Sequence, residues 1–191
     1  RVTTKNLTTD TGANKDKVDE EGRSSLFKAS QEGHEEVVKL LLGVGADVNK
    51  QDTRQRKTPL HLALYYSFKS IALLLCQAKP NPNVLNEDKE TPLLLACKAG
   101  ESEIIKMLIE NGADPRIPDK EGTTPLHAVI TGEQVKALIE AGADKNQLDG
   151  KGQTPLHGAI EQQGCNDRVQ ALNEAGADLN NKDDNEKTPL M

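Results

Sequence analysis

Histidine and cysteine are the residues of this chain most able to hold a metal or perform catalysis. There are four histidines and three cysteines, and none forms the closely spaced ligand pairs of a zinc site. His61, His127 and His157 lie 30 to 96 residues apart, each as the fourth residue of one recurring phrase. They therefore belong to successive copies of that phrase rather than to one metal site. No Gly-rich phosphate loop and no arrangement of nucleophile and base occurs. We therefore expect neither an enzyme nor a cofactor.

The three cysteines point to a reducing environment. Cys76 and Cys97 fall at small or apolar positions of predicted helices, which favours core packing over metal binding. Cys165 lies in a polar stretch, where we expect an exposed thiol. An odd number of cysteines without a disulfide pattern indicates the cytoplasm or the nucleus.

The recurring phrase defines a repeat. Its copies begin with residues 24, 58, 91, 124, 154 and 188, so that the steps are 34, 33, 33, 30 and 34 residues. The clear copies are Thr58-Pro59-Leu60-His61, Thr91-Pro92-Leu93-Leu94, Thr124-Pro125-Leu126-His127, Thr154-Pro155-Leu156-His157 and Thr188-Pro189-Leu190-Met191. A Gly-Ala-Asp phrase follows four of the copies, at residues 45–47, 112–114, 142–144 and 176–178. Self-similarity at this period predicts a repeat array with an extended surface.

Residues 91–123 show what one copy should form. Thr91 can cap a helix whose first residue is Pro92, and Gly100 should end that helix. Residues 103–109 have apolar side chains at helical spacing, and Gly112 follows them at the usual place of a left-handed cap. Residues 119–122 read as a turn before the next copy. Helices this short need packing against neighbouring copies to be stable.

These phrases resemble the ankyrin-repeat family over about residues 16–191. The resemblance implies an all-α solenoid in which each repeat is a helix-turn-helix followed by a β-hairpin-like finger loop. We expect a polar, loosely ordered leader at 1–18 and one ankyrin-repeat domain at 19–191. Its full repeats are 24–57, 58–90, 91–123, 124–153 and 154–187, with partial units at both ends. The chain lacks an initiator Met and stops within a copy, so we expect a piece of a longer protein.

The same resemblance implies roles for particular residues. The phrase histidines should join a hydrogen-bond network with the preceding Thr and nearby backbone. Partners of ankyrin repeats usually meet the finger tips and the concave face of the first helices. At such positions repeat two carries both tyrosines of the chain beside three basic residues, and Tyr and Arg are enriched in binding hot spots. The predicted partner-binding residues are Arg54, Arg56, Lys57, Tyr65, Tyr66, Glu90 and Lys98. The alternative is that one tyrosine packs against Phe68 and the charges are ordinary surface.

Composition and charge narrow the class of partner. The chain carries a formal net charge of −6, which argues against nucleic acid, and it has no apolar run long enough to span a bilayer. We therefore expect a non-catalytic, monomeric scaffold or interaction module that binds a protein partner. The alternatives are a regulatory domain of a larger enzyme, channel or pathogen effector, and a free-standing inhibitor that masks a partner.

Two further expectations follow from the repeats. Asn49 and Asn180 lie in Asp-Val-Asn and Asp-Leu-Asn sequences eight residues after a leucine, which resembles the sites of asparaginyl hydroxylase in other ankyrin domains. In repeat five, Arg168 and Asn173 occupy helix positions that are apolar in repeat three. The loss of apolar burial predicts that the C-terminal end frays first.

Overall fold

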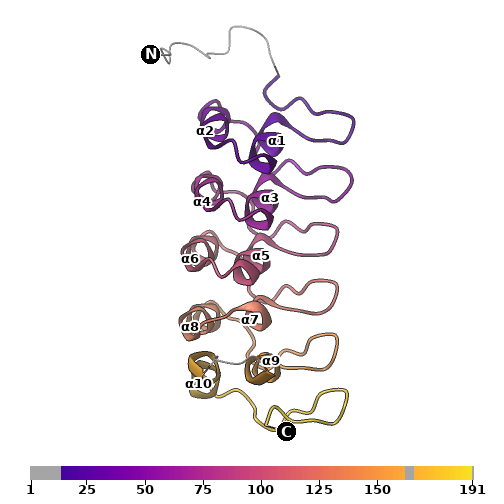
Figure 1. The fold of residues 1–191 in the computed structure, drawn as a ribbon, viewed down its shortest axis with the longest axis vertical. Coiled ribbons are helices and arrows are strands. Elements are labelled where there is room, and N and C mark those ends of the chain that lie inside the picture. Colours follow the sequence, from indigo (N-terminus) through magenta and orange to yellow (C-terminus); the bar gives the residue numbers. More distant parts are fainter. Residues whose placement is uncertain (1–13, 162–165, 191) are drawn as a thin grey trace. The chain divides into compact units, whose positions relative to one another are not determined.

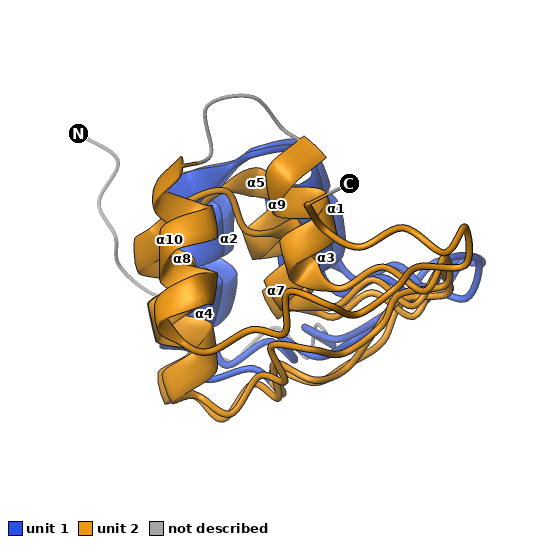
Figure 2. Cartoon of the chain, turned by 90° about the horizontal axis from the view of Figure 1, so that it is seen from below, with its two compact units in different colours: residues 1–80 blue, residues 81–191 orange. Residues whose placement is uncertain are grey.

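The computed structural model describes residues 14–161 and 166–190, which contain ten α-helices and no β-strand. These residues fall into two compact units, one ending at Pro80 and one starting at Asn81 (Figure 2). The N-terminal unit holds α1 (Ser25–Gln31), α2 (Glu35–Gly43), α3 (Pro59–Tyr65) and α4 (Lys69–Gln77). The C-terminal unit holds α5 (Pro92–Ala99), α6 (Ser102–Glu110), α7 (Pro125–Ala128), α8 (Gly132–Glu140), α9 (Pro155–Glu161) and α10 (Asn166–Glu174). The predicted all-α, ankyrin-type architecture is confirmed.

The Thr-Pro phrase starts helices α3, α5, α7 and α9 as predicted, whereas Ser24 caps α1. Thr58 Oγ1 accepts a hydrogen bond from the backbone N–H of His61, and Thr91 Oγ1 accepts one from Leu94 at 3.1 Å. A proline occupies the first helical position in both cases, where its missing N–H is not needed. Gly100 ends α5 in the left-handed conformation, with a φ of 72° that a side chain would oppose. The phrase is therefore a local signal for where each first helix begins.

The core of each unit lies between the two helices of a repeat and between neighbouring repeats. In the N-terminal unit α1 packs against α2 and α3, and α4 packs against α2 and α3. In the C-terminal unit α7 lies between α5 and α9, while α8 contacts α6 and α10. The leucine of every phrase from 24 to 157 is fully or almost fully buried: Leu26, Leu60, Leu93, Leu126 and Leu156. These leucines therefore form the shared centre of the repeats.

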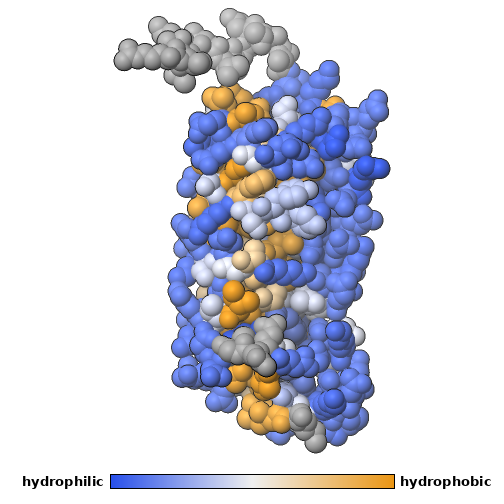
Figure 3. Space-filling model, in the orientation of Figure 1, coloured by the Kyte–Doolittle hydropathy of each residue, from blue (hydrophilic) through white to orange (hydrophobic). Residues whose placement is uncertain are grey.

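A finger turn precedes the first helix of each repeat. The six finger turns are residues 19–23, 52–57, 86–90, 119–123, 149–153 and 183–187. In each, an Asp or Asn side chain accepts backbone N–H groups of the turn, as Asp119 does from Glu121 and Thr123. Within each unit the odd-numbered helices lie between the even-numbered helices and the finger turns (Figure 1). On the face shown in Figure 3 the finger side is hydrophilic, whereas hydrophobic residues gather along the helices.

Repeat four is three residues short, and the structure shows how the gap is filled. Helix α7 has only four residues and ends at Ala128. Gln134 is buried, donates to Gly100 O and Ser102 Oγ, and accepts from the N–H groups of Ile130 and Thr131. A polar side chain thus replaces the missing helical turn.

Arg168 corrects an expectation from the sequence. It stands where repeat three has an apolar residue, yet it is only 1% exposed. Its Nη2 donates to the backbone carbonyl of His127 at 3.0 Å and to that of Pro155 at 3.4 Å. The expected loss of a buried contact at this position is therefore wrong, because the arginine is itself buried and binds the end of the shortened α7. Asn173 is exposed.

Residues 14–18, the last part of the predicted leader, contact the turn that follows α2. Lys15 Nζ donates to the carbonyl of Gly45 at 2.5 Å, and Asp16 accepts from the N–H of Asp47. Lys145 and Asn146 make the same contacts one repeat apart, with Ala175 and Asp178. Residues 1–13 lie outside the described residues, so the leader and the single domain at 19–191 stay predictions.

Candidate functional site

The phrase histidines hold the fold together. His127 Nδ1 lies 2.8 Å from Thr124 Oγ1, and its Nε2 lies 3.0 Å from the carbonyl of Gln153 in the next finger turn. His157 repeats this arrangement with Thr154 and Lys187. Burial lowers the pKa of His127 despite its hydrogen bond to Gln153, so its ring is neutral at pH 7. The predicted network role is thus seen in the geometry, and no group of three metal-ligating side chains gathers within 14–161 and 166–190.

The two described cysteines are packed in the core. Cys76 on α4 and Cys97 on α5 are at most 1% exposed. Burial raises the pKa of Cys76 to about 12, so it remains a thiol rather than a nucleophilic thiolate. Cys165, for which an exposed thiol was predicted, lies outside the described residues.

The two tyrosines stand at the end of α3 and are exposed. Tyr65 is 60% and Tyr66 is 45% exposed, which is unusual for large aromatic side chains. Their rings meet edge to face at a centroid distance of 5.1 Å, and Tyr66 lies 6.0 Å from Phe68. The contact with Phe68 was the alternative prediction, and it holds for Tyr66. It steadies the ring but leaves nearly half of the residue accessible.

The three predicted basic residues lie in the finger turn 52–57 beside the tyrosines. Lys57 Nζ lies 4.4 Å from the centre of the Tyr65 ring, a cation–π contact. Arg54 Nη1 forms an exposed ion pair with Glu21 of the preceding finger turn at 3.2 Å. Arg56 is exposed in the left-handed region, with a φ of 53°, at the one-residue insertion of this repeat. Five of the predicted contact residues therefore lie in one finger turn and at one helix end of the N-terminal unit. They are Arg54, Arg56, Lys57, Tyr65 and Tyr66.

A groove of about 300 Å³ lies between these elements. Its lining combines two finger turns with α1 and α3, and consists of Glu21, Arg23, Phe27, Gln31, Asp52, Arg54, Gln55, Lys57, Leu62 and Tyr66. Three of the predicted contact residues line it: Arg54, Lys57 and Tyr66. Tyr65 and Arg56 lie outside the lining. This groove is the candidate functional site, which we call the finger groove.

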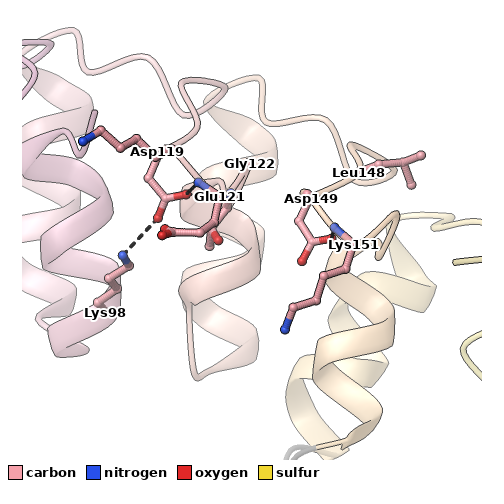
Figure 4. A pocket seen from close by; sticks show the side chains of 10 residues that line it. Lys98, Asp119, Glu121, Gly122, Leu148, Asp149 and Lys151 are labelled. Carbon is pink, nitrogen blue, oxygen red and sulfur yellow. Dashed lines mark hydrogen bonds and ion pairs between the residues drawn. The ribbon is translucent and has the colours of Figure 1, made fainter. Parts of the chain in front are cut away.

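The other two predicted contact residues lie in the C-terminal unit and pair with each other. Lys98 Nζ is 2.9 Å from Glu90 Oε1. It is also 3.1 Å from Asp119 Oδ2, whose side chain is 1% exposed (Figure 4). Burial opposes the charge of Lys98, but the bonds to Glu90 and Asp119 outweigh it and raise its pKa. Together with finger turns 119–123 and 149–153, Lys98 lines a second hollow of about 770 Å³. Lys98 thus links the finger turns 86–90 and 119–123 through its ion pairs and is also partly exposed to solvent.

The two candidate hydroxylation sites lie in equivalent turns. Asn49 and Asn180 are both exposed. Their backbone N–H groups donate to the side chains of Asp47 and Asp178 at 2.9 and 2.8 Å. Both amide side chains are therefore placed at the surface, and their modification stays a prediction.

Sequence reasoning missed the apolar floor of the finger groove. Phe27 and Leu62 line the groove although both are buried residues of α1 and α3. A signal was available for Phe27, because it is one of two phenylalanines and takes the histidine position of the phrase. Arg23 was not among the predicted partner-binding residues, although it lines the groove and pairs with Asp19 and Glu21.

Comparison with known proteins assigns these features to a family. A family model described as ankyrin repeats in three copies matches residues 3–85, 66–149 and 128–191. The helices, phrases and finger turns described above fall within those matches. In the described part of the chain, no helix combines the length and the apolar character that crossing a membrane requires.

Individual relatives agree. The chain is 31% identical over 104 residues to the E3 ubiquitin-protein ligase KEG of Arabidopsis thaliana. This match covers 54% of this chain and 6% of the ligase. It is 36% identical over 118 residues to human inversin, covering 61% of this chain and 11% of inversin. An ankyrin repeat protein of fowlpox virus, FPV223, is 32% identical over 109 residues, covering 57% of this chain and 75% of the viral protein. The chain thus spans only a small part of the ligase and of inversin. With a family model over almost its whole length, the chain belongs to the ankyrin-repeat family, whose repeats are protein-interaction modules.

Proposed function

We propose that this chain is a non-catalytic scaffold that binds a protein partner through its finger tips and the face of its first helices. The observation that carries the proposal is that recurring and variable side chains lie in different environments. The recurring residues form hydrogen bonds within the fold: Thr124 bonds to His127, and His127 bonds to the next finger turn. The residues that differ between repeats, above all Tyr65 and Tyr66, stay exposed.

The finger groove has the composition of an interaction hot spot. Tyrosine and arginine dominate such spots because they combine large contact area with polar groups at low entropic cost. Here Tyr66 and Arg54 line the groove. Tyr65 lies outside the lining, and its ring makes the cation–π contact with Lys57. The cation–π contact and the ring contacts hold these side chains before a partner arrives, which lowers the entropy lost on binding.

Glu90 and Lys98 contribute a second contact in this proposal. Their mutual ion pair is partly exposed, so a partner group can reach it from solvent. Because Lys98 also holds the buried carboxylate of Asp119, its replacement should disturb the finger turns as well as the contact. Tyr65 and Tyr66 therefore give the cleaner test.

Affinity capture from a lysate of the source or host organism tests the proposal. The bait is the full chain, and mass spectrometry identifies what it retains. A folded Tyr65→Ala/Tyr66→Ala variant serves as the second bait, because it removes exposed aromatic area without touching the buried core. The proposal expects at least one protein that the wild type retains and the double variant loses. Equal retention by both baits would show that the tyrosines are not part of the binding surface.

Regulation of an attached domain is the second candidate function. It is favoured by the relatives of which the match covers only a small part, such as the ligase, of which it covers 6%. The attached domain would be an enzyme, a channel or a pathogen effector, and a free-standing inhibitor is the third candidate. In all three cases we propose a monomer in the cytoplasm or nucleus. A catalytic or membrane-spanning segment in the parent gene would favour regulation over the scaffold.

A further inference from the structure

We propose that the finger groove takes an acidic, extended peptide segment of the partner, with an aromatic or aliphatic side chain as its anchor. This inference rests on the proposed function and adds the chemistry of what is bound. It starts from charge. The finger turn 52–57 carries three cations and one carboxylate, whereas in each of the other five finger turns carboxylates equal or outnumber cations. This one basic finger stands in a chain whose net charge is −6.

The carboxylates that line the groove are already occupied. Asp52 is 7% exposed and accepts the backbone N–H groups of Arg54, Gln55 and Lys57. Glu21 is shared between Arg23 and Arg54, at 2.8 and 3.2 Å. Neither acid is therefore placed to neutralise Lys57. Glu20 and Glu32 are exposed in the same unit but do not line the groove.

The cations of this finger turn, in contrast, can still pair with carboxylates of a partner. Within residues 14–161 and 166–190, Lys57 has the ring of Tyr65 as its contact and no ion pair, and Arg56 has none either. Arg54 pairs with Glu21 only at the surface, with 73% of its side chain exposed. An exposed pair of this kind contributes little to stability, so a carboxylate of the partner can replace Glu21 at small cost. Three guanidinium or ammonium groups on one turn thus present donors to an acidic chain.

Apolar surface beside the cations supplies the anchor site. Tyr66, 45% exposed, supplies this surface, and Phe27 and Leu62, each only 4% exposed, back it at the floor of the groove. An acidic chain alone would be screened at physiological salt, whereas burial of one aromatic or aliphatic side chain adds affinity that salt does not remove. The expected ligand therefore alternates acidic residues with at least one large apolar residue. An extended chain suits this geometry because its side chains reach the rim and the floor in turn.

A random twelve-residue peptide display library provides the test, since the natural partner is unidentified. The library is selected on the full wild-type chain and on the variant Arg54→Gln/Arg56→Gln/Lys57→Gln. A matched variant, Lys120→Gln/Lys151→Gln, removes two finger cations of the C-terminal unit. We expect wild-type selection to enrich Asp and Glu together with Phe, Tyr or Leu. The strongest peptide should bind the triple variant at least fivefold more weakly, and the matched variant within twofold of wild type.

Several results would overturn the inference. One is enrichment of Lys and Arg, and another is equal enrichment on the triple variant. Competition by a twelve-residue oligothymidylate at the same concentration as the acidic peptide would show a general polyanion surface instead. Repeating the lysate capture with the triple variant separates this inference from the proposed function. A partner that still binds the triple variant but not Tyr65→Ala/Tyr66→Ala would leave the scaffold proposal standing and end the acidic one.

Discussion

Replacement of Arg168 by methionine tests how the shortened repeat four is held. Methionine has a similar length and fills the buried site without a cavity as large as alanine would leave. The backbone carbonyl of His127, at the end of the four-residue α7, would then lose its 3.0 Å hydrogen bond to the guanidinium. A hydrogen bond to a charged group contributes about 1.5–3 kcal/mol, and the longer bond to Pro155 adds little. Because the apolar side chain is easier to bury than the charged one, we expect a net loss of about 1–2 kcal/mol.

Hydrogen exchange followed by mass spectrometry is the appropriate assay. A chain with two compact units need not unfold in one step, so a single midpoint is not a safe measure. A loss of about 1.4 kcal/mol corresponds to a tenfold fall in protection. We expect that fall in peptides covering α7 and α10, with α1 to α4 unchanged. Arg168→Lys keeps the charge but not the planar fork, and should fall between wild type and Arg168→Met.

Arg116→Met is the matched control for this prediction. Arg116 is also charged and hydrogen-bonded, but its pair with Asp114 is exposed on the surface. Its loss should change protection by less than about threefold, in line with other surface pairs. Protection of α7 within twofold of wild type in Arg168→Met would refute the argument that the arginine holds the end of that helix. In the wild type, the same data test the sequence-based prediction of faster exchange in α10 than in α6.

Three further predictions concern other parts of the chain. Gly132→Ala should destabilise by about 1–3 kcal/mol, because the new Cβ would lie 2.5 Å from the carbonyl of Asp167, whereas Gly43→Ala in α2, with open space around it, should stabilise by about 0.5–1 kcal/mol; hydrogen-exchange protection of α8 and α2 measures both. Burial lowers the pKa of His127, so the unfolded chain binds more protons and stability should fall as the pH drops below about 6.5, the ordinary value; hydrogen-exchange protection of α7 at pH 7.5 and 5.5, corrected for the intrinsic exchange rate, measures this, and His127→Gln should reduce the slope. Asparaginyl hydroxylase should add one oxygen each to exposed Asn49 and Asn180, seen by mass spectrometry.

Each of these has a clear opposite result. Equal stability of the two glycine variants would mean that the close approach of Asp167 is relieved without cost. A pH slope that is the same in wild type and His127→Gln would show that this histidine does not link protonation to folding. Absence of any added oxygen after incubation with the active hydroxylase would reject the modification of both asparagines.

Much of the fold follows from local residue patterns. Thr58 and Thr91 before proline mark helix starts, and Gly100 and Gly112 mark helix ends, because capping depends on neighbours within a few residues. An altered copy of the Gly-Ala-Asp phrase, Gly-Ala-Asn, also stands at residues 12–14. The contacts of Lys15 and Asp16 with the Gly45–Asp47 turn show that residues 14–16 act like the other copies.

The contacts between repeats could not be predicted in the same way. Arg168 reads as a polar replacement in a weak helix, and only the position of the α7 carbonyl end, 41 residues earlier, explains its burial. The pairing of Arg54 with Glu21 likewise joins residues 33 positions apart. Tyr65 and Tyr66 could be singled out from the sequence because the repeat register predicts which positions face outward. The finger groove that unites Tyr66 with Phe27 required the structure.

We propose that the finger side of α3 is the surface that binds a protein partner. The direct measurement is the dissociation constant of the captured partner for three forms of the full chain. These are the wild type, Tyr65→Ala/Tyr66→Ala, and Val37→Ala/Leu40→Ala, which removes comparably exposed apolar residues from α2. A hot spot of about 2 kcal/mol predicts a roughly thirtyfold weaker complex for the tyrosine variant and a change within about twofold for the α2 variant. Wild-type affinity in the tyrosine variant, or a larger loss in the α2 variant, would contradict the claim.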